Sequence, residues 1–480
     1  MLALRPFAGY AIASTKGKMY SNQEKNTVKR ARIAVVAIAL VLAVLFTAFA
    51  FIVYFSGKRD LPKAQIEANL AALTEDKGYG YACSYVTELG INSFDKLKLK
   101  RIESYYQGLY VGELPTAMEL AKSTVSLYLE YFYDELTRKG DEGEITDALI
   151  TCYVASTGDR YGFYRNETQS NQYGEDTSGE YVGIGITVFT EPDEDGNIVI
   201  LSVGKDSPAR EAGILPGDLI VSVEGRAVSE IGAEAASSAI RGESGTSVQI
   251  GIKRGEEILN LSVKRRLVTE ESVSYSVLDG NVGLVTVTGF KGNTPEQFRE
   301  AIDALEALGV RAIVFDMRNN PGGLLSAITE VLAYLVPTGT RVVSYVTADG
   351  AEQVLYAEED EGGADHVLKI PCAVLCNGYT ASAAELFTAA LRDYNKMGLL
   401  DAITVGEKTF AKGIMQSTYT LPDKTTITLT IAFYNPPSGV NYDGKGVQPD
   451  FEKPEDMSDE ELAKYAAELI FDPPIIKHPN

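Results

Sequence analysis

The chain has 480 residues, of which 45% are hydrophobic, and its formal net charge is −22. This length exceeds that of one ordinary domain, so we expect two or three folded units. The acidic balance argues against a nucleic-acid partner, because binding to a duplex depends on Lys and Arg side chains that neutralise phosphates.

The first 55 residues predict a membrane anchor. Residues 1–32 carry seven basic side chains against one acid, and residues 33–55 follow without a single charge. As a helix, the second stretch would span about 34 Å, which is enough to cross a hydrocarbon core of about 30 Å. The positive-inside tendency then keeps residues 1–32 in the cytoplasm and places the rest of the chain outside it.

A cleaved signal peptide is the alternative interpretation of this segment. Ala48-Phe49-Ala50 offers an A-x-A cleavage pattern. The apolar run continues past this pattern to Phe55, however, and it is longer than the hydrophobic part of a usual signal peptide. We therefore expect an uncleaved, single-pass anchor in the cell membrane, with the folded units on the extracytoplasmic side.

Residues 56–178 are predicted to form a helical N-terminal region that ends in a linker. Within residues 116–136, apolar side chains recur at spacings of three and four, which is typical of an amphipathic helix. These side chains are Met118, Ala121, Val125, Leu129, Phe132 and Leu136. Residues 166–178 are polar and are predicted to be the linker.

Four cysteines give little sign of a disulfide framework or a metal site. Cys372 and Cys376 lie on one predicted strand, so their Cα atoms would be about 13 Å apart, beyond the roughly 7 Å that a disulfide can bridge. Cys83 and Cys152 could pair outside the cell, but their spacing does not decide this. The sequence contains no C-x-x-C pair and no clustered His, so we expect no metal site and no cofactor.

Residues 179–268 combine a Gly-rich stretch with several short turn motifs. Glycine alternates with apolar residues at Val182, Gly183, Ile184, Gly185 and Ile186. The further motifs are Ser207-Pro208-Ala209, Ala212-Gly213 and Pro216-Gly217-Asp218-Leu219-Ile220. Together they resemble a PDZ module, a β-sandwich-like fold with helices. In such a module the backbone N–H groups of the Gly-rich loop bind a peptide's terminal carboxylate, and the adjoining strand edge adds the peptide as one more strand. The alternative is a PDZ fold that only packs against its neighbour.

A mixed α/β core is predicted for residues 269–456, followed by a C-terminal tail at residues 457–480. The apolar stretch 282–287, an amphipathic helix at 294–308 and a buried strand at 311–316 suggest a parallel βαβ crossover.

Directly after the second of these strands, Gly322 and Gly323 allow a close backbone approach, and their N–H groups can face an oxyanion. The alternative is a simple turn that closes an αβ layer, but ligands tend to bind at the carboxyl ends of parallel strands.

Ser382 is the candidate nucleophile of this core. A buried strand at residues 371–376 is broken by Asn377-Gly378, and helical spacing begins at Ala383. Ser382 therefore precedes a helix N-terminus, where unpaired N–H groups and the helix dipole favour developing negative charge. The alternative is that Ser382 is only an N-cap.

A serine hydroxyl needs a base, and Lys412 is the candidate for that role. The chain has only two histidines, His366 and His478, and the second lies two residues from the C-terminus. A lysine can serve as the base if burial lowers its pKa from about 10.4 towards about 7 to 8. Phe410 could supply a dry wall. The alternative is that Lys412 is a solvated surface group, as most lysines are.

These segments resemble the catalytic region of the C-terminal processing peptidases, also called tail-specific proteases. The matching stretches are NGYTASAAE at 377–385, GEKTFAKGIMQ at 406–416 and DMRNNPGG at 316–323. The resemblance implies Ser382 as nucleophile, Lys412 as general base and Gln416 as the residue that orients the lysine. It covers residues 144–451 and also gives Asp393 a supporting role.

The same comparison implies an oxyanion hole formed by the N–H of Ala383 with one from Gly322 or Gly323. The chain departs from the family's pattern at Tyr379, Thr380, Ala384 and Ala411, and the loop after Asp393 is longer than usual. None of these departures removes a reacting group.

The sequence therefore predicts a membrane-anchored serine endopeptidase that cuts with a Ser-Lys dyad outside the cytoplasm. Its protein or peptide substrates would be bound by their C-terminus through the PDZ module. The alternative is a non-catalytic PDZ scaffold on a degenerate peptidase fold, which the intact Ser382 and Lys412 disfavour. The family suggests that the helical region serves homodimerisation, whereas the need for an activating partner stays open.

Overall fold

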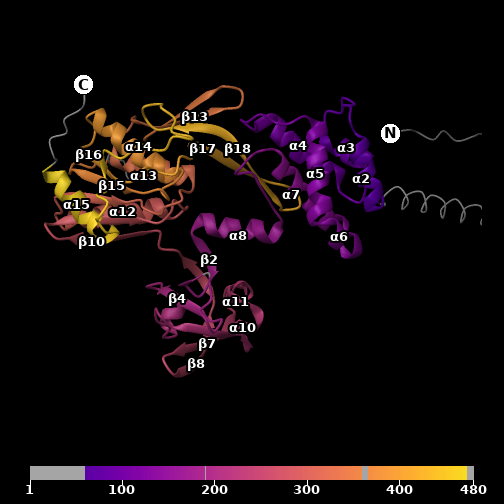
Figure 1. Cartoon of the computed structure of the whole chain (residues 1–480). Helices are drawn as coiled ribbons and strands as arrows, with labels where there is room; N and C mark the ends of the chain where they lie inside the picture. The colour runs from indigo at the N-terminus through magenta and orange to yellow at the C-terminus, as the bar shows by residue number, and fades with distance from the viewer. Residues whose placement is uncertain (1–59, 190, 359–365, 473–480) are drawn as a thin grey trace, which may run out of the picture.

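The computed structural model describes residues 60–189, 191–358 and 366–472. The predicted basic tail and transmembrane helix lie outside these ranges. Within the described ranges, no helix combines the length and the apolar character needed to cross a membrane. Figure 1 shows a helical region, a mixed α/β core and a third unit that stands apart from both.

The N-terminal region is helical, as predicted. Its elements are α2 (Lys63–Ala72), α3 (Ala82–Leu89), α4 (Lys96–Leu109), α5 (Ala117–Tyr131), α6 (Tyr133–Lys139) and α7 (Glu142–Ser156). Helix α5 begins at a capping box in which the Thr116 side chain accepts from the Glu119 N–H while the Glu119 carboxylate accepts from the Thr116 N–H. The buried face of α5 packs between α3 and α7.

A long strand joins this helical region to the α/β core. Strand β18 (Thr426–Asn435) pairs at its start with β1 (Phe163–Arg165), which follows α7. At its end it pairs with β13 (Arg341–Thr347) of the core, and β17 (Ile414–Thr420) runs antiparallel beside it. Figure 1 shows β17 and β18 extending from the core to the helices.

The segment predicted as a polar linker forms a helix, α8 (Glu167–Ser178). Only Ser170 is buried in it, so no apolar stripe marked it as helical. Its start is a capping box between Asn166 and Gln169, which satisfies backbone N–H groups that would otherwise lack partners.

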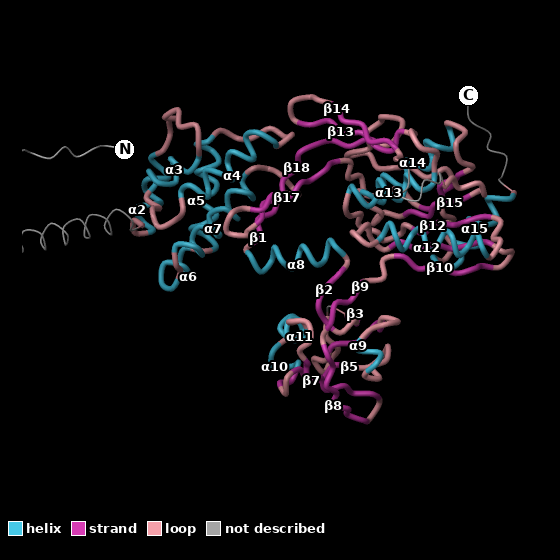
Figure 2. Tube along the Cα trace, turned by 180° about the vertical axis from the view of Figure 1, so that it is seen from behind, coloured by secondary structure: helices cyan, strands magenta, loops and turns pink. Residues whose placement is uncertain are grey.

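The third unit is a small β-rich domain at the position of the predicted PDZ module. The strands are β2 (Glu180–Gly183), β3 (Ile186–Val188), β4 (Ile198–Val203), β5 (Leu219–Val223), β6 (Arg226–Ala227), β7 (Ser247–Arg254), β8 (Glu257–Lys264) and β9 (Arg266–Thr269), and the helices are α9 (Pro208–Glu211), α10 (Val228–Ile231) and α11 (Ala233–Ile240). Strands β2 and β9 pair antiparallel and carry the chain into and out of this domain. Figure 2 shows the domain beyond these two strands from behind.

The core is built on a six-stranded sheet of order β10-β11-β12-β15-β16-β19. Its strands are β10 (Val273–Leu278), β11 (Val282–Val287), β12 (Ala312–Asp316), β15 (Cys372–Cys376), β16 (Ala402–Gly406) and β19 (Phe451–Glu452). All neighbours pair parallel except β10 with β11. The predicted βαβ crossover is confirmed, because α12 (Thr294–Ala307) joins the parallel strands β11 and β12.

Helices cover both faces of this sheet. Helices α12, α13 (Leu325–Leu335) and α14 (Ala383–Lys396) pack on one face, while β13 and β14 (Glu352–Tyr356) belong to the second sheet with β18. The opposite face packs against α15 (Asp459–Phe471), so the described part of the predicted C-terminal tail belongs to the core. The reason is its apolar stripe, which buries Leu462, Ala466 and Leu469.

All four cysteines are free and buried. Burial raises the pKa of the Cys83 thiol to about 11 and that of Cys152 to about 12. Both therefore act as small apolar residues of the helical region rather than as reactive thiols.

Candidate active site

Ser382 lies where the chain turns from β15 into α14, in a backbone conformation that non-glycine residues rarely adopt. Its φ is 57° and its ψ is −120°. Three hydrogen bonds hold its backbone there. The Ser382 N–H donates to Glu385 Oε2 at 2.9 Å, and the Ser382 carbonyl accepts from the Tyr442 hydroxyl at 3.1 Å and from the Leu386 N–H at 3.0 Å. Strained residues of this kind cluster at functional sites, and here the surroundings maintain the strain.

Of the two glycines after β12, Gly322 packs against the Ser382 backbone and Gly323 packs against Phe290. Gly322 has a φ of 101°, and a Cβ on it would lie 2.7 Å from Ser382 Cβ and 2.8 Å from the Ala383 nitrogen. Gly323 has a φ of 149°, and its Cβ would lie 2.0 Å from the Phe290 carbonyl oxygen. A side chain at Gly322 would force this loop away from Ser382, and one at Gly323 would force it away from Phe290.

The three predicted oxyanion donors differ in availability. The Gly322 N–H donates to Asn320 Oδ1 at 2.8 Å, so it fixes the loop. The N–H groups of Ala383 and Gly323 form no hydrogen bond with the described part of the chain. The Ala383 N–H directly follows Ser382 in the chain, and an unpartnered N–H near a serine hydroxyl can stabilise charge on a carbonyl oxygen.

Glu385 connects the serine to the lysine segment, a role that the sequence analysis did not assign. Its buried carboxylate accepts hydrogen bonds from four donors. They are the N–H groups of Ser382, Ala411 and Lys412 and the hydroxyl of Thr409. The S-x-x-E spacing of Ser382 and Glu385 is that of a capping box and could have identified this residue.

Lys412 follows Ala411, whose φ is 81°, and is partly buried. Burial lowers the pKa of Lys412 from its ordinary value, whereas the negative charges of Glu385 and Asp159 oppose the shift. Its Nζ lies 4.2 Å from the ring centroid of Tyr161. Tyr161 belongs to the segment between α7 and β1, so the helical region contributes directly to this site.

Phe410 does not form the expected apolar surface that would exclude water from Lys412. Its side chain is 53% exposed, and its N–H donates to the Thr380 carbonyl at 3.0 Å. The aromatic ring at Lys412 is that of Tyr161 instead. Sequence reasoning missed Tyr161 because it lies 251 residues before Lys412 in the printed numbering.

Ser382 and Lys412 share the site without touching through their reactive atoms. No hydrogen bond joins Ser382 Oγ to Lys412 Nζ, both of which belong to the described residues. Ser382 Oγ instead lies 3.2 Å from the hydroxyl oxygen of Tyr434, which is also 3.1 Å from the Lys412 carbonyl oxygen. The Tyr434 hydroxyl therefore links the backbone carbonyl of Lys412 to the side chain of Ser382. The amine of Lys412 lies over the ring of Tyr161 instead.

The Tyr434 hydroxyl is fully buried and carries a single proton, which can serve only one of its two neighbours at a time. Burial raises the pKa of Tyr434. The Tyr434 hydroxyl therefore donates either to Ser382 Oγ or to the Lys412 carbonyl oxygen. Sequence reasoning placed Tyr434 only at the end of the core, since its proximity to Ser382 depends on β18.

Gln416 and Asp393 do not contact Lys412 through hydrogen bonds. The Gln416 amide donates to Thr430 Oγ1 at 3.3 Å and to the Ile414 carbonyl at 3.5 Å. The hydroxyl of Thr430 in turn donates to Asp159 at 2.7 Å. Asp393 is buried on α14 and accepts from the Ser438 N–H at 3.0 Å. It lies eleven residues after Ser382, which corresponds to about 16 Å along a helix.

A cleft of about 540 Å³ opens at the carboxyl ends of β12, β15 and β16. Such positions bind ligands in open parallel sheets. Its lining includes Arg318, Asn319, Asn377, Gly378, Tyr379 and Glu407. The cleft thus adjoins the turn that leads to Ser382. Among the described residues, no group of His, Cys, Asp and Glu with the spacing of metal ligands gathers at Ser382 and Lys412.

The predicted peptide-binding loop ends at an open sheet edge. Strand β3 pairs only with β4, so its other edge is free within the described structure. Gly185 has a φ of 76°, and a Cβ on it would lie 2.4 Å from Ser207 Cβ. The N–H groups of Ile184 and Gly185 form no hydrogen bond with the described residues, while their carbonyls accept from Ala209 and Gly204. Val182 and Gly183 belong to β2 and pair with β9, and Ile186 begins β3.

Comparisons with family models agree with this division of the chain. The model of Peptidase family S41 matches residues 281–453, and the PDZ domain model matches residues 182–264.

Individual relatives extend the match. The chain is 34% identical over 326 residues to the "Probable CtpA-like serine protease" of Staphylococcus haemolyticus, covering 67% of this chain and 63% of that protein. It is 33% identical over 321 residues to the "Carboxy-terminal processing protease CtpA" of Bacillus subtilis, covering 67% and 66%. The matched region thus spans less than two thirds of the length of these relatives. Among solved structures, the photosystem II D1 C-terminal processing protease matches at 25% identity with a TM-score of 0.44, covering 77% of this chain and 96% of that one.

Proposed function

We propose that the chain is a membrane-anchored serine endopeptidase of the C-terminal processing type. The proposal is supported by the match of the Peptidase family S41 model to residues 281–453 and of the PDZ domain model to residues 182–264. Its substrates are proteins or peptides bound by their C-terminal ends outside the cytoplasm. The observation that carries the proposal is Ser382, held at a positive φ against Gly322 and followed by the unpartnered N–H of Ala383.

The proposed chemistry uses Ser382 and Lys412 as a dyad. Neutral Lys412 takes the proton of Ser382 while the serine oxygen attacks the scissile carbonyl. The N–H groups of Ala383 and Gly323 bind the oxyanion, and water then hydrolyses the acyl-enzyme. The lowered pKa of Lys412 supports this role, because only the neutral amine can act as a base.

The described arrangement is proposed to be a resting one. A general base must come within hydrogen-bond reach of the proton that it accepts, and Lys412 Nζ lies over Tyr161 instead. Lys412 therefore has to leave the Tyr161 ring before the dyad forms, and Gln416 would orient the amine only after that movement. Substrate binding or an activating partner could supply the movement.

The PDZ domain is proposed to read the terminal carboxylate of the substrate. The support is the pair of unpartnered N–H groups at Ile184 and Gly185 beside the open edge of β3.

The anchor is proposed from residues 33–55, and the basic residues before it favour an extracytoplasmic catalytic unit. Exposed apolar side chains on the helical region, such as Leu97 and Tyr131, suit the homodimerisation that the family suggests.

The alternative function is a non-catalytic PDZ scaffold, which would be consistent with the absence, within the described chain, of a hydrogen bond between Ser382 Oγ and Lys412 Nζ. One experiment separates the two functions. The full-length chain, purified in detergent, is incubated with an unfolded protein substrate. We expect cleavage by the parent chain and none by Ser382→Ala. Lys408→Ala, four residues from Lys412 and exposed, serves as the matched lysine control and should cleave normally. A parent chain that binds peptides but never exceeds Ser382→Ala in cleavage would support the scaffold.

A further inference from the structure

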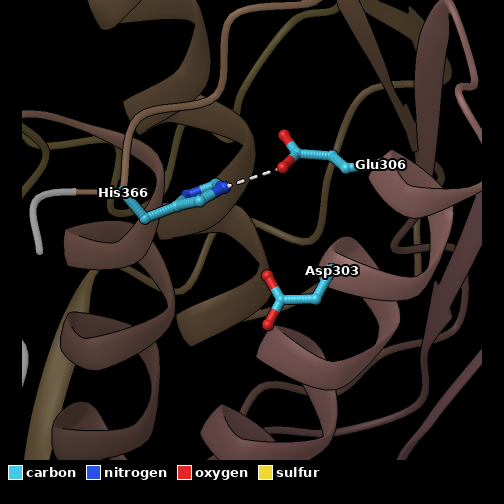
Figure 3. Close-up of side chains that lie close together, drawn as sticks. All are labelled: Asp303, Glu306 and His366. Carbon is cyan, nitrogen blue, oxygen red and sulfur yellow. Dashed lines mark hydrogen bonds and ion pairs between the residues drawn. The ribbon is translucent and has the colours of Figure 1, made fainter. Parts of the chain in front are cut away.

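Three side chains with metal-binding groups meet on the outer side of the core. Asp303 and Glu306 lie on α12, and His366 lies in the segment that leads to β15. Figure 3 shows the two carboxylates and the imidazole converging from these two elements. One ligand atom from each residue can be chosen so that all lie within 4.8 Å of one another. Sequence spacing did not reveal this group, because His366 follows Glu306 by 60 residues.

Tyr334 of α13 orients two of the three side chains. Its carbonyl oxygen lies 2.7 Å from His366 Nδ1, and its ring stacks on the imidazole with centroids 4.0 Å apart and planes 4° apart. The Tyr334 hydroxyl donates to Asp303 Oδ1. Metal-binding histidines and carboxylates are commonly held by outer partners of this kind, which fix the ring and the tautomer.

The hydrogen bonding of His366 leaves a site for a cation. The Tyr334 carbonyl can only accept, so Nδ1 carries the proton that it donates. In the neutral ring, Nε2 is then an acceptor, and it faces the acceptor Oε2 of Glu306 at 3.3 Å. Two lone pairs directed at each other repel, and a positive charge between them removes the repulsion. The carboxylate of Asp303 is a third acceptor in this group. A single proton shared between His366 Nε2 and Glu306 Oε2 would not need a third acceptor.

We propose that Asp303, Glu306 and His366 bind a divalent transition-metal ion, for which Zn²⁺ is the probe. One imidazole nitrogen with carboxylate oxygens suits Zn²⁺, whereas Ca²⁺ and Mg²⁺ prefer all-oxygen ligands. Water completes the coordination. The ion would link the segment at His366 to α12. It would take no part in peptide cleavage, because no hydrogen bond or ion pair in the described chain links its three ligands to Ser382 or Lys412.

The test is a zinc titration of the full-length chain, purified in detergent without a polyhistidine tag and stripped with EDTA. ZnCl₂ is added at constant pH in competition with a chromophoric chelator, and the thermal unfolding midpoint is measured with and without the ion. We expect one bound equivalent and a higher midpoint with zinc. Glu306→Gln and His366→Gln should each weaken binding by at least about tenfold, since each removes a direct ligand.

Two variants separate metal binding from general effects. Glu300→Gln removes an exposed acid from the same helix and should leave zinc affinity unchanged. Glu306→Gln should keep the metal-free unfolding midpoint, because its amide can donate to His366 Nε2. Equal zinc affinity in the parent chain and Glu306→Gln would overturn the proposal. So would a parent chain that zinc does not stabilise at any pH, which would leave only the ion pair between His366 and Glu306.

Discussion

Ser382 combines an unfavourable backbone conformation with hydrogen bonds to both its N–H and its carbonyl. A non-glycine residue in such a region costs about 1–3 kcal/mol, which the surrounding contacts must offset. Glu385 and Tyr442 supply those contacts, and Gly322 leaves the room that the conformation needs. The backbone conformation of Ser382 is thus held by three residues that are not its immediate sequence neighbours.

Lys412 should control the pH dependence of cleavage. Its folded-state pKa is lowered by burial, and the base must be neutral, so activity should rise with pH through that lowered pKa. Lys412→Ala and Lys412→Arg should both lower kcat by about 10²- to 10⁴-fold, because a guanidinium stays protonated. Rates of peptide cleavage measured over a pH series would check this. A nearly inactive His366→Ala with a near-normal Lys412→Ala would contradict the dyad.

Tyr434→Phe should lower kcat by about tenfold while leaving KM unchanged. The substitution removes the hydroxyl that lies between Ser382 Oγ and the Lys412 carbonyl, so it affects the position of the nucleophile rather than substrate binding. Tenfold corresponds to about 1.4 kcal/mol, within the range of a lost buried hydrogen bond. Tyr275→Phe is the control, since Tyr275 lies on the edge strand β10, is 50% exposed and does not line the cleft. An increase in KM alone would show that Tyr434 acts on substrate binding.

At the scale of elements, α14 and the segment before β17 are joined by one buried carboxylate. Glu385 lies in the first turn of α14, and its partners Ala411 and Lys412 precede β17. The helix and the lysine segment therefore keep a fixed spacing even while the lysine amine faces Tyr161. The same carboxylate accepts the hydroxyl of Thr409, so none of its oxygens lacks a donor.

Glu385→Gln should destabilise this junction by about 1–3 kcal/mol. An amide nitrogen would replace one acceptor oxygen and face backbone N–H groups that can only donate, which leaves them without partners. Thermal unfolding of the full chain would record a lower midpoint, and cleavage should fall with it. Glu455→Gln, at an exposed site of the core outside the cleft, should change neither quantity. Unchanged stability in Glu385→Gln would mean that the four bonds contribute little.

The edge of β3 and the loop before it should distinguish a free from an amidated C-terminus. Amidation removes the charge that the N–H groups of Ile184 and Gly185 would bind, and a hydrogen bond to a charged group contributes about 1.5–3 kcal/mol. We therefore expect turnover of an amidated substrate to fall by about ten- to a hundredfold at low substrate concentration. Gly185→Val, whose Cβ would meet Ser207, should reproduce the loss on the free substrate. Equal rates on both substrates would show that the loop does not read the terminus.

Periodic elements could be predicted from the sequence, whereas contacts between distant segments could not. The β11–α12–β12 crossover was predicted because apolar alternation and helical spacing follow each other there. Helix α8 was missed because it has no apolar face, although its capping box was visible in the residues. Motifs identified Ser382 and Lys412, but Tyr161 and Tyr434 reach them through the pairing of β18 with β1 and β13.

At the scale of the whole molecule, β18 is shared by two units. Its first residues pair with β1 next to the helices, and its last residues pair with β13 in the core. Asp159, which precedes Tyr161, accepts from the N–H and the hydroxyl of Thr430 in the middle of this strand. The helical region is therefore attached to the catalytic core through the same strand that carries Tyr434.

The proposed membrane anchor gives a prediction for the intact cell. If residues 33–55 span the membrane and residues 1–32 lie in the cytoplasm, protease added outside cells without an outer wall should degrade the catalytic unit. Immunoblotting against the core and against a cytoplasmic control protein would record this. Protection of the core in such cells, or release of a shortened soluble form, would contradict the anchor.

The ring of Tyr161 offers an optical view of the lysine. The chain contains no tryptophan, so a Tyr161→Trp protein would hold a single indole, next to the Lys412 ammonium. Indole is the strongest aromatic partner for a cation, so the resting contact should be kept. Departure of the ammonium would change the emission of that one fluorophore. Stopped-flow mixing with substrate could then time the movement of the base separately from bond cleavage.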